Sequence, residues 1–476
     1  MNSNAYSFEK KQLSNYSYNY SQILNSYIIF LIIFGNFFYN ILSFLKHGPS
    51  ILDRIIFFFT IISLFVFIYY IRIKRFNPFR IFFDFLFSIL LVFITYVYIY
   101  FPLNSLNKTH PSLFIILIIS VIIWSFFINE KIVINRYLIL ILFFSFTLLF
   151  NIIINGIPNG SYTIFKINSF LVYTLIPCFY IFVVTDKQLI DILKSLTIYF
   201  IILTLIYGFF NLKLENYEFF EIFGGNYIST GSVYGIGFLY VFFDFKCKNI
   251  LYRIIKLGIL SIFSFFILNT GARGPIISLL FTIFISYLFY YFHDKIKIIY
   301  LSIFLALIII FILTFNLSNP INFFTTNNAG IMRLMNSYKN IKMGNFNEFS
   351  AGRLYLYKEA YKNFLEKPLF GKGIGKNEKI GFYPHNSFLE IASQLGLFGF
   401  LPFIVLLIYW FYFFIKSEII FWKISEYRLI KYLFIYFLIE SLFSGTIFWN
   451  IQFWSLLALS GIIFTIENKY YKFQLD

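Results

Sequence analysis

Residues 395–415 read LGLFGFLPFIVLLIYWFYFFI and contain no charged side chain. A helix rises about 1.5 Å per residue, so roughly 20 mostly apolar residues are needed to cross the hydrocarbon core of a bilayer, which is about 30 Å thick. This stretch meets that requirement. It predicts a membrane-spanning helix near the C-terminal end of the chain.

Similar apolar runs occur along most of the sequence. Of the 476 residues, 60% are hydrophobic and only 12% are charged, whereas a soluble domain is typically about half apolar and a quarter charged. A water-soluble core cannot hold this excess, but a bilayer can. The other runs are 23–45, 55–71, 81–101, 112–129, 137–155, 168–185, 192–210, 228–244, 254–270, 274–292, 297–316, 429–447 and 450–466. We therefore predict an all-α polytopic membrane protein with about 12 to 14 transmembrane helices.

The charges between the runs indicate how the chain crosses the membrane. Cytoplasmic loops are enriched in Lys and Arg, and alternate gaps together with both tails hold most of these residues. The sparser gaps hold only Lys46, Arg54, Lys108, Lys166, Lys213 and Arg273. Both termini are therefore predicted to be cytoplasmic, and topology rather than nucleic acid binding explains the net charge of +17. The predicted organisation is a tail at 1–22, helices over 23–316, one long extracytoplasmic loop with short helices at 317–394, helices over 395–466 and a tail at 467–476.

Arg273 lies in the segment Asn269-Thr-Gly-Ala-Arg-Gly-Pro275, at the outer ends of two consecutive runs. The glycines allow a tight turn, and Pro275 suits the first turn of the following helix. An arginine at membrane depth usually faces a cavity or a partner, and the N–H groups of a helix N-terminus can bind an anion. Two interpretations are open, an anion site or an arginine that extends to the membrane surface.

The long loop contains Ser350-Ala-Gly-Arg353, followed by apolar residues at helical spacing. These residues predict an amphipathic helix over roughly 351–366, which Pro368 ends. Arg353 then falls in the first turn, where a cation opposes the helix dipole. Either an anionic ligand compensates for this arrangement, or Arg353 is a solvated surface residue.

Two further segments of the loop complete the candidate set. Pro368-Leu-Phe-Gly-Lys-Gly-Ile-Gly375 is rich in glycine but lacks the Gly-Lys-Ser/Thr ending of a P-loop, so we predict a hairpin or re-entrant turn. In Tyr383-Pro-His-Asn-Ser-Phe-Leu-Glu390, Ser387 and Glu390 have the spacing of a capping box. Capping does not explain His385, which is a candidate general base or hydrogen-bonding residue. No cluster of His, Cys and carboxylates has ligand spacing, so neither a metal site nor a cofactor is expected.

Taken together, these segments resemble the signature region of the O-antigen ligase and polymerase superfamily of bacterial membrane glycosyltransferases. The similarity runs from Ser350 to about Phe403, and Thr-Gly-Ala-Arg-Gly is similar to the family's Ser-Arg-Gly element. Ala272 and Pro275 stand where the family often has Ser and Ala. The resemblance implies a GT-C-like helical fold in the bacterial inner membrane. It also implies transfer of a glycan from an undecaprenyl-diphosphate carrier to a lipid A core, a lipid-linked repeat or a protein.

The resemblance also implies roles for individual residues. Arg273 and Arg353 would hold the donor diphosphate, and His385 would activate or orient the acceptor hydroxyl. The secondary candidates are Asn386, Glu390 and Tyr383. Glu390 is interpreted as a capping residue first and as a candidate base second. Because two arginines would take the place of a divalent metal, the expected enzyme is metal-independent.

Other functions remain open at this stage. An O-antigen ligase is favoured, but a repeat-unit polymerase of the same superfamily fits the same motifs. A polysaccharide flippase or other transporter would need paired charges at mid-membrane, for which Asp84 and Glu440 are the main candidates. A non-catalytic scaffold would leave the arrangement of Arg273, Arg353 and His385 to chance.

Overall fold

A computed structural model of the chain describes residues 135–156, 161–184, 204–205, 227–243, 250–293, 329–346, 350, 352–376, 383–420 and 427–475. All of them belong to one compact unit, made of residues 118–184 and 201–476; a second unit comprises residues 1–117 and 185–200. The predicted runs at 23–45, 55–71, 81–101, 112–129 and 297–316, and most of 192–210, lie outside the described residues. Asp84 lies outside them as well.

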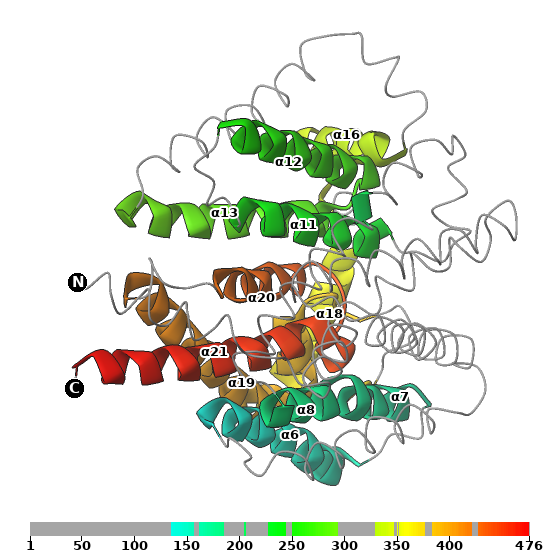
Figure 1. The fold of residues 1–476 in the computed structure, drawn as a ribbon. Coiled ribbons are helices and arrows are strands. Elements are labelled where there is room, and N and C mark those ends of the chain that lie inside the picture. Colours follow the sequence, from blue (N-terminus) through cyan, green and yellow to red (C-terminus); the bar gives the residue numbers. More distant parts are fainter. Residues whose placement is uncertain are drawn as a thin grey trace, which may run out of the picture. The chain divides into compact units, whose positions relative to one another are not determined.

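The described residues form helices and turns, with no strand among them (Figure 1). The helices are α6 (Arg136–Asn155), α7 (Ser161–Phe170), α8 (Ile176–Val184), α11 (Tyr227–Phe243), α12 (Ile250–Thr270), α13 (Arg273–His293), α16 (Ala329–Lys342), α18 (Arg353–Glu366), α19 (Ser387–Ile420), α20 (Arg428–Glu440) and α21 (Ile451–Leu475), with a π-helical turn at Leu171–Leu175 and a 3₁₀ turn at Ile447–Trp449. Among them, α6, α19 and Ile451–Asn468 of α21 are long and apolar enough to cross a membrane. The chain is therefore a helical, multi-pass membrane protein.

Hydropathy located most of these helices well. The run predicted at 429–447 is not one helix, because α20 ends at Glu440 and turns follow up to the 3₁₀ turn at Ile447–Trp449. Helix α19 begins at Ser387, within the long loop predicted at 317–394. Within α19 the backbone breaks at Gly396, at φ 63° and ψ −161°, which is close to the predicted start of the span.

Glycines in α11 allow its neighbours to approach closely. A Cβ on Gly235 would lie 2.5 Å from the hydroxyl oxygen of Tyr436 on α20, and a Cβ on Gly237 would lie 2.5 Å from the ring of Phe263 on α12. Without a hydrophobic driving force between helices in lipid, close van der Waals packing over small residues supplies much of the attraction. The contacts of α11 with α12 and with α20 follow this arrangement.

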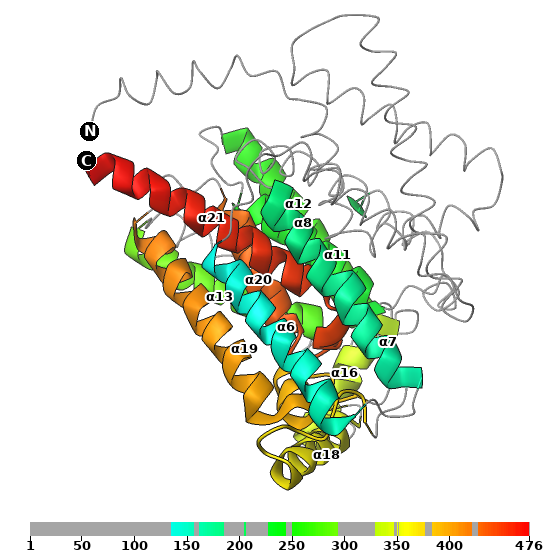
Figure 2. The same ribbon diagram turned by 90° about the horizontal axis from the view of Figure 1, so that it is seen from below.

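Aromatic side chains fill the space between α6, α19 and α21, which run side by side (Figure 2). Trp454 is fully buried, with ring centroids 5.3 Å from Phe144 and 5.8 Å from Phe170. Its indole N–H donates a 2.8 Å hydrogen bond to the carbonyl oxygen of Ile447. Trp410 is equally buried and donates to Ser460 Oγ at 2.6 Å. Each indole therefore packs its apolar surface and satisfies its polar atom, as a buried tryptophan requires.

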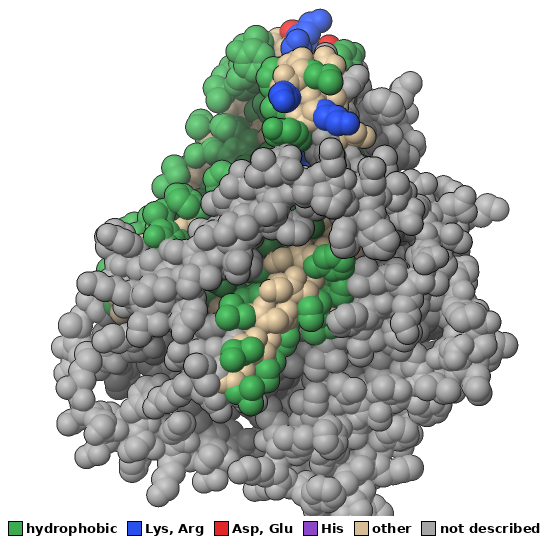
Figure 3. Space-filling view, turned by 90° about the horizontal axis from the view of Figure 1, so that it is seen from above, with side chains coloured by type: hydrophobic (Ala, Val, Ile, Leu, Met, Phe, Trp, Pro, Cys, Tyr) green, Lys and Arg blue, Asp and Glu red, His purple; other side chains and the backbone are tan. Residues whose placement is uncertain are grey.

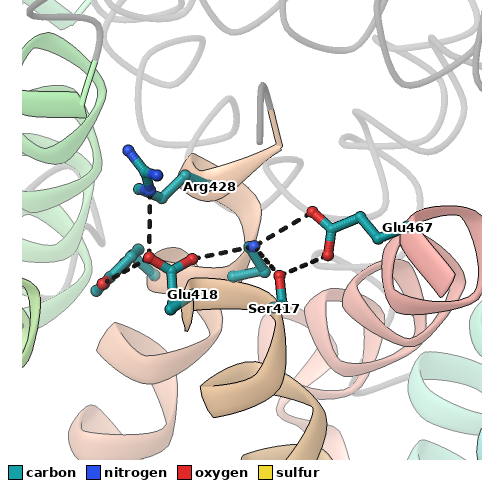
Figure 4. Close-up of polar contacts among 6 residues, drawn as sticks. Ser417, Glu418, Arg428 and Glu467 are labelled. Atoms are coloured by element: carbon teal, nitrogen blue, oxygen red, sulfur yellow. Dashed lines mark hydrogen bonds and ion pairs between the residues drawn. The ribbon is translucent and has the colours of Figure 1, made fainter. Parts of the chain in front are cut away.

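A buried network of charges joins the C-terminal parts of α19 and α21 to the start of α20 (Figure 4). Lys431 Nζ lies 3.0 Å from Glu418 Oε1 and 3.3 Å from Glu467 Oε1, and Arg428 Nε lies 3.2 Å from Glu418 Oε2. Ser417 and Tyr432 complete the hydrogen bonds of the two carboxylates. Two cations thus balance two anions, so no net charge is buried here.

The glycine-rich segment 368–375 forms a series of turns that pack against the break in α19. The sequence predicted a turn in this segment. Lys372 N and Gly373 N donate to the carbonyl oxygens of Ser393 and Gln394, both at 3.0 Å. From the other side, Asn151 Nδ2 on α6 donates to the carbonyl oxygens of Phe370 and Gln394, at 2.5 and 3.2 Å. The turns and the break therefore satisfy each other's backbone groups.

Replacing Asn151 by alanine is expected to lower the stability of the protein by about 1 to 3 kcal/mol, because both carbonyl oxygens lose a buried donor. Asn155→Ala is the matched control, because among the described residues the Asn155 side chain makes a single hydrogen bond, at 3.3 Å, to the carbonyl oxygen of Phe370. Thermal unfolding in detergent measures both effects. Equal losses for the two variants would contradict this account of how the turns are held.

Candidate functional site

A short turn after α20 is the point at which the segments that carry the predicted site residues meet. Residues Ser441–Ser444 continue from α20, with the N–H groups of Phe443 and Ser444 donating to the carbonyl oxygen of Glu440 at 2.9 Å. We call these four residues the α20 turn. Segments that lie far apart in the sequence contact it, and each of them begins a helix: α13, α18 and α19.

Arg353 is the first residue of α18, as predicted, and its side chain reaches the α20 turn. Its Nη1 donates a hydrogen bond to the carbonyl oxygen of Phe443. No carboxylate among the described residues forms an ion pair with it. Tyr357, one helical turn further along, is half-buried, and burial raises the pKa of its phenol, against a lowering by Arg353. Tyr357 is therefore neutral near pH 7 and does not neutralise the positive charge of Arg353.

Arg273 begins α13 directly after the tight turn that ends α12, as predicted from its glycines and Pro275. Gly271 has a φ of 62° in that turn. Beside Arg273, a Cβ on Gly274 would lie 3.7 Å from Phe443 Cβ and 3.8 Å from Ser444 Oγ. The start of α13 therefore touches the same residue of the α20 turn whose carbonyl oxygen binds Arg353. Ala272 is fully buried and packs toward Gly231 on α11.

His385 precedes α19, in a segment that is bonded to the α20 turn. Asn386 Nδ2 donates to the carbonyl oxygen of Leu442 at 3.2 Å, and the Ser387 N–H donates to that of Ser441 at 3.0 Å. His385 itself has a φ of 53°, a left-handed conformation that is uncommon outside glycine. Its ring centroid lies 4.1 Å from that of Tyr383. Such a backbone persists only when its surroundings hold it, and it is found most often at functional sites.

The capping interpretation of Ser387 and Glu390 is wrong. Asn386 caps α19, because its Oδ1 accepts from the N–H groups of Phe388 and Leu389, both at 3.1 Å. Glu390 is fully buried and points into the bundle, where Lys166 Nζ lies 2.7 Å from its Oε1. Asparagine is as good an N-cap as serine, so the sequence pattern alone does not separate the two positions.

Lys166 does not lie in a loop, contrary to the prediction from hydropathy. Helix α7 begins at Ser161, which is seven residues before the predicted start of that span, and Lys166 is fully buried within it. Its partnership with Glu390 was missed because the polar residues around Lys166 resemble a loop. The sequence did contain one indication of a buried ion pair, namely a lysine directly beside an apolar run.

Glu440 ends α20 immediately below the α20 turn. Ser232 Oγ on α11 donates to its Oε1, while its buried Oε2 has no hydrogen-bond partner among the described residues. No cation in the part of the chain that the structure describes pairs with it. The paired mid-membrane charges expected of a transporter are therefore not formed by Glu440 within these residues.

The surface of the described part has an apolar region and a charged region. In the face shown in Figure 3, hydrophobic side chains cover most of the described helical surface, and Lys, Arg and acidic side chains gather at one end. Among the described residues, no three His, Cys, Asp or Glu side chains are placed to hold a metal ion. The cationic groups that the structure shows at the α20 turn are the Arg353 guanidinium and the positive ends of the helix dipoles that begin there.

Comparison with known proteins adds a second line of support. Residues 257–404 match the family model described as O-antigen ligase. This match confirms the resemblance to the O-antigen ligase and polymerase superfamily. The matched O-antigen ligase region covers less than one third of the chain and includes Arg273, Arg353 and His385. No curated protein matches the chain.

The O-antigen ligase region ends within α19 and does not include the α20 turn. The turn was missed from the sequence for a physical reason. Its residues, Ser-Leu-Phe-Ser, follow an apolar helix and precede another apolar stretch, so hydropathy merges them into one span. The following Gly445, at φ 76°, and Thr446 were the available signals of a helix end.

Proposed function

We propose that this protein is a GT-C-like membrane glycosyltransferase that moves a glycan from an undecaprenyl-diphosphate carrier to an acceptor in surface polysaccharide assembly. An O-antigen ligase acting on a lipid A core is favoured over a repeat-unit polymerase. The observation that carries the proposal is that the segments containing Arg273, Arg353 and His385 all contact the α20 turn. The three residues lie 80 and 32 positions apart in the sequence, and a non-catalytic scaffold would not require them to lie near one turn.

The arginines would bind the diphosphate of the donor. Guanidinium groups form charge-assisted, often bidentate hydrogen bonds with phosphate oxygens. Arg273 and Arg353 each begin a helix, so the positive ends of α13 and α18 add to the attraction for an anion. The Arg353 guanidinium binds the carbonyl oxygen of Phe443, and the start of α13 contacts the same residue. We therefore propose that both arginines share one phosphate group.

The transfer itself requires one bond to form and one to break. The acceptor hydroxyl oxygen attacks the anomeric carbon of the sugar, and the bond from that carbon to the phosphate oxygen breaks. His385 would accept the hydroxyl proton, a role for which a neutral imidazole is suited near pH 7. The carrier diphosphate leaves with the additional negative charge, which the two arginines stabilise. Asn386 would hold the His385 segment against the α20 turn.

In this proposal the arginines perform the role that a divalent metal has in many sugar transferases. Transfer by the purified protein is therefore expected to continue at an unchanged rate in the presence of excess EDTA. The assay follows lipid-linked glycan consumed, and a metal-dependent sugar transferase run in parallel shows that chelation was complete. Loss of activity that added Mg²⁺ or Mn²⁺ restores would contradict the metal-independent mechanism.

Deletion of the gene, followed by gel analysis of lipopolysaccharide, separates the two members of the superfamily. Loss of a ligase leaves bare core on the surface and long chains on the carrier. Loss of a polymerase leaves core that carries a single repeat. Unchanged surface glycans of every class would argue against transfer in either form.

A further inference from the structure

Lys166 is an ammonium group buried beneath the His385 segment. Its side chain is 0% exposed, and its Nζ lies 2.7 Å from Glu390 Oε1. The same nitrogen lies 5.0 Å from the ring centroid of Phe448 and 6.0 Å from that of Tyr383. A cation enclosed by one carboxylate and two aromatic faces is strongly fixed in place.

Glu390 connects this ammonium group to the segment that follows the α20 turn. Its Oε1 also accepts from Thr446 Oγ1 at 2.5 Å, and its Oε2 accepts from the Ile447 N–H at 3.0 Å. The carboxylate therefore binds a side chain of α7 and two groups of residues 446–447, while its own backbone belongs to the first turn of α19. Glu390 is 0% exposed and does not reach the surface beside His385.

The pair also contacts the two remaining loops of the site. A Cβ on Gly375, at the end of the glycine-rich turns, would lie 3.5 Å from Lys166 Cδ. On the other side Lys166 faces Tyr383, whose ring packs against that of His385 at 4.1 Å. Lys166 is thus linked to His385 through Tyr383, by a cation–π interaction on one side of Tyr383 and a ring–ring contact on the other.

We propose that Lys166 and Glu390 are positioning residues for His385. The pair joins α7, the start of α19 and residues 446–448, and through Tyr383 it sets the orientation of the His385 ring relative to the α20 turn. A group that holds a reacting side chain acts by geometry, and a displacement of about 1 Å lowers a rate by up to roughly 100-fold. The effect on the transfer rate rests on the proposed function; the effect on His385 itself does not.

The test replaces the pair by apolar residues in the full-length protein. Breaking a buried pair by removing one partner is strongly destabilising, whereas replacing both partners with apolar residues of similar size is often neutral. Lys166→Met/Glu390→Leu is therefore expected to fold and to keep its unfolding temperature in detergent. Lys431→Met/Glu467→Leu is the matched control, because this pair is also buried, with side chains 0% and 8% exposed. The control also removes the contact between Lys431 and Glu418, but Glu418 stays paired with Arg428.

Two readouts are measured on both double variants. The first is the transfer rate, in which the Lys166 and Glu390 variant is expected to lose roughly 10- to 100-fold in kcat and the control variant none. The second is the rate at which diethylpyrocarbonate modifies His385, read by mass spectrometry. We expect this rate to change in the first variant and to equal the wild-type rate in the control.

Each outcome bears on one claim. Wild-type kcat and wild-type His385 reactivity in the folded Lys166→Met/Glu390→Leu variant would overturn the positioning role. If the wild-type protein transfers no glycan, the proposed function fails, while His385 reactivity still tests the positioning. If the double variant does not fold, Thr446→Val serves instead, because it keeps both charges and removes one bond to Glu390, together with the 3.4 Å bond that caps the 3₁₀ turn. Unchanged kcat and unchanged His385 reactivity in that variant would overturn the proposal.

Discussion

Replacing Arg353 by alanine is expected to lower the rate of glycan transfer by roughly 100- to 1,000-fold, the usual effect of removing one group that stabilises developing charge. In the proposed mechanism, the guanidinium group beside the α20 turn is one of two that stabilise the leaving diphosphate. Its loss leaves Arg273 to stabilise that charge alone. Arg353→Lys keeps the charge but not the forked geometry, so its rate is expected to fall between the wild-type and alanine rates.

The measurement uses purified protein in proteoliposomes and a defined lipid-linked glycan. Lys362→Ala is the matched control, because Lys362 is an exposed cation on the same helix, α18. Thermal unfolding of each variant shows whether the lost hydrogen bond to Phe443 also affects folding. A folded Arg353→Ala variant with the wild-type rate would exclude the diphosphate role of this residue.

Replacing Gly396 by alanine is expected to destabilise the protein by more than about 4 kcal/mol, an exceptional value for one methyl group. At φ 63° and ψ −161° the backbone occupies a region that is nearly exclusive to glycine. The added Cβ would lie 2.5 Å from Gly371 N and 2.5 Å from the carbonyl carbon and oxygen of Leu369. These are backbone atoms, so no side-chain rotation can relieve the overlap.

Gly156 offers a closely matched control for this variant. Its φ of 71° and ψ of 168° are almost the same, and a Cβ placed on it meets no atom within 4 Å. Gly156→Ala is therefore expected to lose only the backbone term, about 1 to 3 kcal/mol. The yield and unfolding temperature of the folded protein in detergent separate the two variants. Equal losses of stability in the two variants would show that the contact between the glycine-rich turns and the break in α19 does not contribute to stability.

Much of the fold follows from hydropathy, because crossing a bilayer requires long apolar runs. The spans predicted at 137–155 and 274–292 agree with α6 and α13 within two residues at each end. The amphipathic helix predicted at 351–366 is α18, which begins at Arg353. Hydropathy does not report backbone breaks inside apolar sequence. For this reason the end of α20 at Glu440 and the break at Gly396 were not predicted.

The site was predicted in part. The segments that carry Arg273, Arg353 and His385 have recognisable turn and helix-start residues, so each could be selected from local sequence. The α20 turn that they share is polar only in its serines, and it lies outside the motifs. Lys166 and Glu390 were misassigned for a related reason, since a long-range ion pair leaves no spacing pattern in the sequence. We propose that both misassigned residues position the segment that contains His385.

The most direct test of the central claim is a reconstituted transfer assay with the purified full-length protein, an undecaprenyl-diphosphate-linked glycan and a lipid A core acceptor. Wild-type protein is compared with Arg273→Ala, Arg353→Ala and His385→Ala, each inserted in the membrane in equal amount. The account predicts glycan on the acceptor with the wild-type protein and its near-complete loss in all three variants. Normal transfer by all three variants would contradict it.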